Sequence, residues 1–156
     1  MSEVMHPFIV NLRYSFQSKS ELFIVSEYYN GGDLSYYMHE SKRKFKEIQA
    51  KFIVANIIIG LEFLHSCGVI HRDIRPHNLV FDSNGYIKII DFGLARIMQT
   101  NNSADTSGTP CYMAPEILLR QPHSYSSDFF AVGVIVHEMM TGRLPYPGPD
   151  RVSYKE

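Results

Sequence analysis

The stretch "VIHRDIRPHNLVFDSNGYIKIIDFGLAR", residues 69–96, combines a tight turn with two carboxylates and one amide that lie outside the turn. Asp73 follows His-Arg and lies five residues before Asn78, and Asp91 ends an apolar run. The Asn-Gly pair in "DSNG" is a strong turn signal, so "NLVF" and "YIKII" are predicted to form an antiparallel hairpin. Because neighbouring strands lie about 5 Å apart, this hairpin brings the three side chains to one edge.

That edge presents oxygen atoms suited to a hard cation. Mg²⁺ takes a few protein oxygens together with phosphate oxygens, and Asn78 and Asp91 are able to supply the former. Asp73 stays free to accept a proton from a hydroxyl group. The alternative interpretation is structural: Asp73 accepts loop amides, Asn78 caps the strand entry and Asp91 forms a turn.

The composition favours one globular unit without a nucleic-acid or membrane partner. The chain has 156 residues, of which 45% are hydrophobic, and its formal net charge of -1 gives no reason to expect an anionic partner. The chain has only two cysteines, Cys67 and Cys111, which favours a reducing compartment without a disulfide framework. Neither cysteine has the spacing of a metal site. The apolar run 53–64 is too short for a membrane span, and the amino terminus lacks signal-peptide features. We therefore expect a cytoplasmic location, with the nucleus as the alternative.

The rest of the chain alternates between short β-like segments and apolar helices. Residues 8–17 and 21–29 are β-branched and aromatic and predict another antiparallel hairpin. Residues 98–107 are small and polar and predict a mobile surface loop. Helices are expected at residues 33–40, 45–66 and 128–142. The second of these helices is apolar all round its middle, as a buried helix would be. The fold class is therefore expected to be α+β.

Three motifs in the chain resemble those of the eukaryotic protein kinases. "HRDIRPHN", "DFG" and "APE" match in order and spacing the catalytic loop, the metal loop and the end of the activation segment of that family. "ELFIVSEYYNGGDL" and "SGTPCYMAPE" are similar to the hinge and substrate-binding segment of AGC-like serine/threonine kinases. The resemblance implies a truncated bilobal fold across residues 1–156. Residues 1–29 correspond to N-lobe strands and hinge, and residues 30–156 to the mainly helical C-lobe.

The resemblance implies a catalytic role for five residues. Asp73 would accept the substrate hydroxyl proton, and Arg75 would contact phosphate. Asn78 and Asp91 would hold Mg²⁺. Thr109 would hydrogen-bond Asp73.

A second group implied by the resemblance would bind the nucleotide. Glu27 and Tyr29 would lend backbone groups to adenine, Asp33 would lie near the ribose, and Val80 would also contact the nucleotide. Ser26 falls at the gatekeeper position of the family, or is simply a small core residue.

Three further residues are expected to be architectural. Asp128 would anchor the catalytic-loop backbone, His71 would pack behind Phe92, and Glu116 of the "APE" motif would be structural as well; none of the three is expected to do chemistry.

The implied function is an ATP-dependent serine/threonine protein kinase that uses ATP and Mg²⁺. It would transfer the γ-phosphate to Ser or Thr hydroxyls of a protein substrate, and an upstream activating kinase is a further expected partner. No nucleic-acid partner is expected. The alternative is a catalytically inactive kinase-fold fragment or pseudokinase that acts as a protein-binding module.

The substrate groove departs from the family pattern. Arg75 stands where a lysine is usual, which keeps the charge but presents a planar fork. His77 stands where basic-directed members often carry glutamate, so one acidic contact for a substrate arginine is lost. Asp33 and Glu138 keep two other acidic positions. We therefore expect a weaker demand for arginine at one upstream substrate position.

The activation segment also departs from the family pattern. Asp105 aligns with the usual phosphorylated threonine, near Arg72, so that a fixed charge partly replaces a phosphate. Thr106 and Ser107 are the alternative phosphorylation sites.

No Gly-rich loop and no V-A-I-K lysine occur in the 156 residues. The chain is therefore expected to be a partial gene model, a truncated paralogue or a genuine short product. On its own it is expected to bind ATP–Mg²⁺ weakly and to transfer little phosphate, because the groups that orient the phosphates are absent. Its strands between residues 8 and 28 are expected to expose apolar surface and to favour association.

Overall fold

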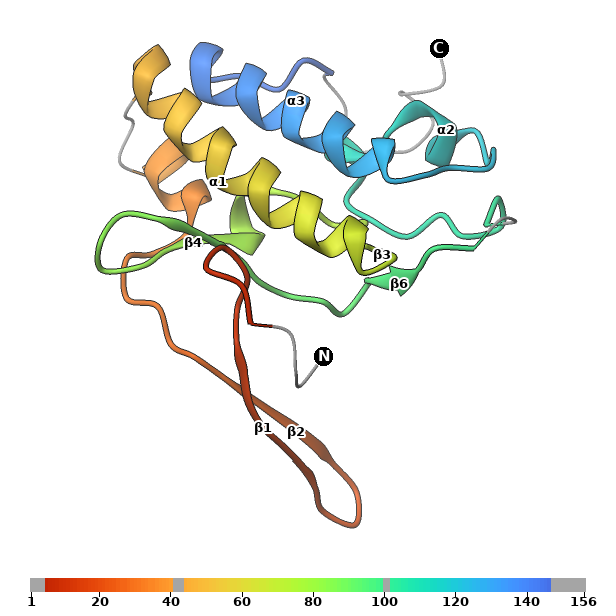
Figure 1. Ribbon diagram of the computed structural model, residues 1–156. Helices are drawn as coiled ribbons and strands as arrows, with labels where there is room; N and C mark the ends of the chain where they lie inside the picture. Colours follow the sequence, from red (N-terminus) through yellow and green to blue (C-terminus); the bar gives the residue numbers. More distant parts are fainter. Residues whose placement is uncertain (1–4, 41–43, 100–101, 147–156) are drawn as a thin grey trace.

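The computed structural model describes residues 5–40, 44–99 and 102–146. A two-stranded hairpin of β1 (Leu12–Gln17) and β2 (Leu22–Ser26) extends away from a mainly helical body (Figure 1). The strands are antiparallel, with an irregular register between Leu12 and Tyr14. The predicted hairpin is confirmed, although its strands are shorter than the β-like segments of the sequence.

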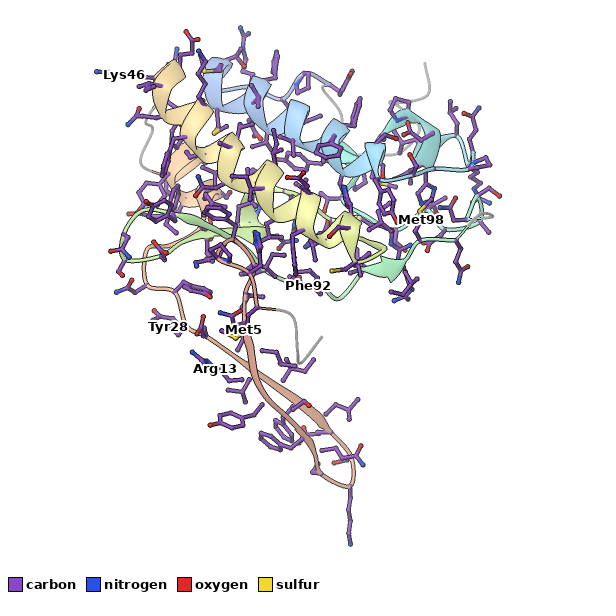
Figure 2. The ribbon with its side chains drawn as sticks, viewed as in Figure 1. Met5, Arg13, Tyr28, Lys46, Phe92 and Met98 are labelled. Atoms are coloured by element: carbon purple, nitrogen blue, oxygen red, sulfur yellow. The ribbon has the colours of Figure 1, made fainter. Side chains whose placement is uncertain are left out.

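The hairpin carries large apolar side chains that point into solvent (Figure 2). Leu22 is 80% exposed and Ile24 is 77% exposed. Phe16 stacks on Phe23 across the two strands, with ring centroids 4.9 Å apart. The expected exposure of apolar surface on these strands is therefore confirmed.

Two long helices form the body. Helix α1 (Glu47–Ser66) and helix α3 (Ser126–Thr141) pack side by side, and α1 also contacts β5 (Ile87–Ile89). A short helical segment precedes them and ends in the π-helical turn η1 (Tyr36–Glu40). Gly142 ends α3 with a φ of 75°, a left-handed conformation that glycine adopts without steric cost. All three expected helices are present.

The expectation that α1 is buried on every side is wrong. Its buried residues form one stripe, whereas Phe52 and Ile58 are 46% and 41% exposed. The reason is that α3 and β5 cover only one side of the helix. By length and composition α1 is the one helix, among those that the structure describes, that could cross a membrane.

Short elements connect the helices and position the loops between them. Strands β4 (Leu79–Phe81) and β5 pair antiparallel, which confirms the predicted central hairpin. Strand β3 (Val69–Ile70) pairs with β6 (Arg96–Ile97), a sheet that the sequence did not predict. The remaining short elements are η2 (Pro76–Asn78), η3 (Pro110–Tyr112) and α2 (Pro115–Leu118). In the predicted loop, residues 98–99 and 102–107 form no helix or strand, and residues 100–101 lie outside the described residues.

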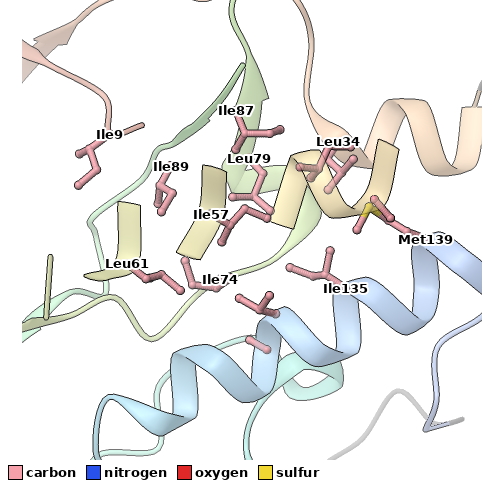
Figure 3. Close-up of a cluster of buried hydrophobic side chains, with 14 of the residues drawn as sticks. Ile9, Leu34, Ile57, Leu61, Ile74, Leu79, Ile87, Ile89, Ile135 and Met139 are labelled. Atoms are coloured by element: carbon pink, nitrogen blue, oxygen red, sulfur yellow. The ribbon is translucent and has the colours of Figure 1, made fainter. Parts of the chain in front are cut away.

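The hydrophobic core lies between the two long helices and the β4–β5 hairpin (Figure 3). Ile57 and Leu61 of α1, Leu79 of β4 and Ile135 of α3 are all fully buried. Burial of a side chain of this size stabilises the fold by about 1.5–3 kcal/mol. This core fixes both ends of the hairpin, and therefore the two loops that carry the polar residues of the opening stretch.

Candidate active site

A buried aspartate holds the loop before the central hairpin. Asp128, in the first turn of α3, is 1% exposed. Its Oδ1 accepts the backbone N–H of Arg72 at 2.8 Å, and its Oδ2 accepts the backbone N–H of His71 at 2.9 Å. The Nε2 atom of His65 lies 2.9 Å from the same Oδ2. The expected contact of Asp128 with the loop backbone is present, and it ties residues 71–72 to α3.

The next residue, Asp73, is the centre of a polar cluster. Asn78 donates through Nδ2 to both the backbone oxygen and Oδ2 of Asp73, each at 2.9 Å. Thr109 donates through Oγ1 to Asp73 Oδ1 at 2.7 Å. Arg75 Nε lies 3.5 Å from Asp73 Oδ2. Four residues that the sequence singled out therefore meet, and both oxygens of one carboxylate are fixed in direction.

The strand register brings Asp91 to the same edge. Ile90 donates its backbone N–H to the carbonyl of Asn78 at 2.9 Å, so the residue before Asp91 is bonded directly to the residue that contacts Asp73. Asp91 is exposed and has a φ of 61°, a conformation that costs an aspartate about 1–3 kcal/mol. Its Oδ1 accepts the N–H of Gly93 at 3.1 Å.

These residues fit a magnesium–phosphate group. The amide nitrogen of Asn78 faces Asp73, which leaves its side-chain carbonyl oxygen turned away from that carboxylate, and an amide oxygen is the kind of ligand that Mg²⁺ takes. The described residues contain no group of three His, Cys, Asp or Glu side chains that could hold a metal ion by themselves. A site of this kind needs phosphate oxygens to complete it. The buried Nε of Arg75 has no hydrogen-bond partner among the described residues and is a donor suited to a phosphate oxygen.

His71 is structural in this arrangement. It is fully buried, and burial holds its pKa below the ordinary value. Its Nδ1 accepts the N–H of Asp73 at 3.3 Å and its Nε2 faces the carbonyl of Ile90 at 3.2 Å, so the neutral ring satisfies both nitrogens. The ring packs edge-on against Phe92 with centroids 5.1 Å apart, as expected from the sequence.

The segment that follows β2 is joined to the central hairpin. Asp33 and Val80 form an isolated β-bridge, which places the two predicted nucleotide residues side by side. Gly31 donates its N–H to the carbonyl of Phe81 at 3.0 Å. A Cβ atom at residue 31 would lie 2.4 Å from that carbonyl oxygen, so only glycine fits this approach.

Comparison with known proteins agrees with this geometry. The model of a family described as "Protein kinase domain" matches residues 1–156. This chain belongs to the protein kinase family. It is 42% identical over 154 residues to ribosomal protein S6 kinase 2 alpha of Xenopus laevis and to ribosomal protein S6 kinase alpha-1 of Homo sapiens. A putative ribosomal protein S6 kinase alpha-1 of Caenorhabditis elegans is 41% identical over 154 residues.

Each alignment covers 97% of this chain but 21%, or for the nematode protein 19%, of the relative. The chain therefore spans about a fifth of the length of these curated relatives. The resemblance to AGC-like kinases and the truncated α+β kinase fold are confirmed.

The segment expected to be the hinge is ordered by Glu27. Its side chain accepts hydrogen bonds from Asn11 at 3.0 Å and from the Tyr29 hydroxyl at 2.6 Å, and it pairs with Arg13. Burial, with this hydrogen bond, raises the pKa of Tyr29 to about 12. Both side chains hold the hinge itself, which leaves the backbone as the part of these residues that would contact adenine.

Ser26 is exposed, so its interpretation as a small core residue is wrong. It lines a mostly apolar cavity of about 440 Å³ between the hairpin and the body, together with Asp91 and Phe92. Residues of the hinge and of the "DFG" motif therefore share one cavity.

Glu138, one of the two acidic positions that remain in the substrate groove, is buried and engaged. Glu138 is 4% exposed, its Oε2 accepts the Tyr112 hydroxyl at 2.7 Å, and its Oε1 lies 3.4 Å from His39 Nε2. Burial and this hydrogen bond raise the pKa of Tyr112. His39 had no sequence signal that linked it to Glu138. His77 is exposed, and its Nε2 lies 3.3 Å from the hydroxyl of Ser35.

Proposed function

We propose that this chain is part of the catalytic domain of an ATP-dependent serine/threonine protein kinase. It would transfer the γ-phosphate of ATP to Ser or Thr hydroxyls of a protein. The observation that carries the proposal is the fixed carboxylate of Asp73, which Asn78 and Thr109 hold from two sides. A carboxylate that is oriented in this way is suited to direct a substrate hydroxyl and to take its proton.

The surrounding residues have separate roles in this proposal. Asn78 and Asp91 would hold Mg²⁺, which neutralises charge on the phosphates when bound. Arg75 would contact the transferred phosphate through its Nε, which forms an ion pair with Asp73 but makes no hydrogen bond. Positioning of this kind supplies most of the catalysis in phosphoryl transfer.

Nucleotide binding is assigned to the hinge and to the β-bridge between Asp33 and Val80. Glu27 and Tyr29 would present backbone groups to adenine, while Asp33 and Val80, joined by their β-bridge, would lie against the ribose and the base. This division corresponds to N-lobe strands and hinge in residues 1–29 and to C-lobe in residues 30–156.

The partners follow from the same assignment. The names of these relatives describe kinases of a ribosomal protein, which supports a protein substrate here. We place the protein in the cytoplasm, with the nucleus as an alternative, and regard α1 as a core helix and not a membrane span, because it packs on α3 and β5. No nucleic-acid partner is proposed. An upstream activating kinase would act on the segment that contains Thr106 and Ser107.

A second candidate is a protein-binding module without catalytic activity. The exposed apolar side chains of the hairpin, with Leu22 80% exposed, favour this candidate. A surface of this kind is typical of a contact with another protein.

Asp73→Asn tests the catalytic proposal in a full-length protein rebuilt around residues 1–156. Transfer of radiolabelled γ-phosphate to a basic protein should fall by about 100-fold or more, because the oriented proton acceptor is lost. The fold should persist, since Asp128 and not Asp73 holds the loop backbone. Glu47→Gln, in an exposed pair with Lys51, is the matched control and should leave transfer unchanged. Transfer near the wild-type rate in Asp73→Asn would contradict the proposal.

A further inference from the structure

Lys88 of β5 lies between three segments of the chain. Its Nζ donates to the carbonyl of Pro7, lies 3.8 Å from Asp82 Oδ2 and lies 5.5 Å from the centroid of the Tyr29 ring. The side chain is only 14% exposed. A lysine ammonium has three donors and no acceptor, so this one cation serves the segment before β1, the turn after β4 and the hinge segment, residues 27–29.

Two of these partners are fixed by contacts of their own. The segment that contains Pro7 continues onto the edge of β5, where Val10 donates its N–H to the carbonyl of Ile89 and Ile89 donates to the carbonyl of Phe8, each at 2.9 Å. Asp82 Oδ1 accepts two backbone N–H groups of its own turn, also at 2.9 Å. The ammonium of the lysine is therefore held at a defined place on the body of the molecule.

The third partner, Tyr29, belongs to the hinge segment. Its ring is partly buried against Lys88, and its hydroxyl donates to Glu27 Oε2 at 2.6 Å. An ammonium within about 6 Å of the centre of an aromatic ring is attracted by the negative face of the ring. The neighbouring Tyr28 is 88% exposed. The hinge segment thus meets the body through one tyrosine side chain and leaves the other in solvent.

These contacts form a continuous path from β5 to β1. Lys88 holds the ring of Tyr29, the hydroxyl of Tyr29 holds Glu27, and Glu27 accepts Asn11 at 3.0 Å and pairs with Arg13. Every step of the path uses a side chain, so the backbone of residues 27–29 is left for other contacts.

We propose that Lys88 is a positioning residue for nucleotide binding, which sets the hinge backbone at its distance from the β4–β5 hairpin through the ring of Tyr29. The inference rests on the proposed kinase function and adds a residue to its nucleotide site. Lys88 would not contact the nucleotide itself, because its ammonium is engaged by Pro7, Asp82 and the ring. Its effect would appear as the fraction of molecules whose hinge is ready to receive adenine.

The test compares Lys88→Met and Lys88→Arg with the control Lys51→Met in the full-length protein. Methionine keeps an unbranched side chain without the charge, and Lys51, 69% exposed on α1, is a matched lysine that does not contact the hinge. Apparent affinity falls with the population of the competent conformer, so loss of one cation–π contact should raise the dissociation constant of ATP–Mg²⁺ about 3- to 10-fold. Calorimetry measures this constant.

Kinetics separates positioning from a general loss of activity. In Lys88→Met the KM for ATP should rise with the dissociation constant, while kcat at saturating ATP should stay within about twofold of wild type, because the nucleotide then restores the competent conformer. Lys88→Arg keeps the charge and stacks on aromatic rings, so it should recover most of the affinity. Lys51→Met should leave KM and kcat unchanged.

A double-mutant cycle tests whether Lys88 acts through Tyr29. Tyr29→Leu removes the same contact from its other side, so the double variant with Lys88→Met should bind ATP–Mg²⁺ within about twofold of the weaker single variant. Tyr28→Leu, at the exposed neighbouring tyrosine, is the matched control and should leave the affinity unchanged. Effects that multiply in the double variant would show two independent roles and would overturn the proposal.

Hydrogen exchange without nucleotide gives a readout that does not depend on activity. Residues 27–31 should exchange faster in Lys88→Met and in Tyr29→Leu, but not in Lys51→Met or Tyr28→Leu. If the wild-type protein binds no ATP–Mg²⁺, the proposed function fails while the exchange comparison still tests the contact. If Lys88→Met loses stability in urea but keeps the wild-type affinity and exchange at residues 27–31, Lys88 is only structural and the proposal is overturned.

Discussion

Replacement of Asp128 by alanine should destabilise the chain more than any other change of a single carboxylate in the site. The substitution leaves the N–H groups of His71 and Arg72 buried without an acceptor, and it also removes the partner of His65. Each unpaired buried group costs about 1–3 kcal/mol, so the two N–H groups together predict a loss of about 2–6 kcal/mol. This loss is a large part of the 5–15 kcal/mol, roughly, that stabilises a typical domain.

The measurement is urea unfolding of the 156-residue chain, followed by far-ultraviolet circular dichroism because the sequence has no tryptophan. Asp128→Asn retains one acceptor oxygen and should lose about half as much stability as the alanine variant. Glu47→Gln is an exposed control that should stay within about 0.5 kcal/mol of wild type. A loss below about 1 kcal/mol in Asp128→Ala would refute the reasoning, because both N–H groups would then have found other acceptors.

Three further changes test other parts of the structure. Burial lowers the pKa of His71 from 6.5, so below that pH the unfolded chain binds a proton more readily than the folded chain. The free energy of unfolding should stay level above pH 6.5 and fall below it, by at most about 1.4 kcal/mol per pH unit, and His71→Gln should reduce that slope in urea titrations. Gly31→Ala forces the new methyl group against the carbonyl of Phe81, so the free energy of unfolding should fall by about 1–3 kcal/mol and the urea midpoint should fall with it. Gly133→Ala is the matched control, because a Cβ atom there meets open space, and it should leave the stability unchanged. In the full-length protein, His77→Glu should strengthen the preference for arginine at one upstream substrate position, by about 1–3 kcal/mol of peptide-binding free energy, as measured on a peptide array. An unchanged preference would show that residue 77 does not contact the substrate.

The parts of the fold with strong local signals were predictable from the sequence. The Asn84-Gly85 pair specified the central hairpin, and Gly142 marked the end of α3. The β3–β6 sheet was missed because each strand has two residues, too few for a period-two pattern to show. The exposed side of α1 was missed because periodicity reports the apolar residues of a helix and not the neighbours that cover them.

In the candidate site, too, the features with a local sequence signal were predictable and those that depend on packing were not. The cluster of Asp73, Asn78 and Thr109 was expected from the order of the motifs, and the geometry brings these residues together. The contact between His39 and Glu138 joins residues far apart in the chain and depends on how α3 lies beside η1. Polar pairs of this kind have no local sequence signature, so only the packed structure reveals that Glu138 is engaged.

Asp128 holds the catalytic loop through two backbone N–H groups and not through the side chains at positions 71 and 72. Every residue except proline offers the same N–H group, so the anchor itself does not require the guanidinium of Arg72, although the φ of 68° at this position disfavours β-branched residues. A lineage could therefore exchange Arg72, and with it the electrostatic input from the neighbouring segment, while the loop keeps its shape and Asp73 keeps its place. In this architecture the anchor that places Asp73 and the contact of Arg72 with the neighbouring segment therefore rest on different atoms, so that one is able to change while the other is kept.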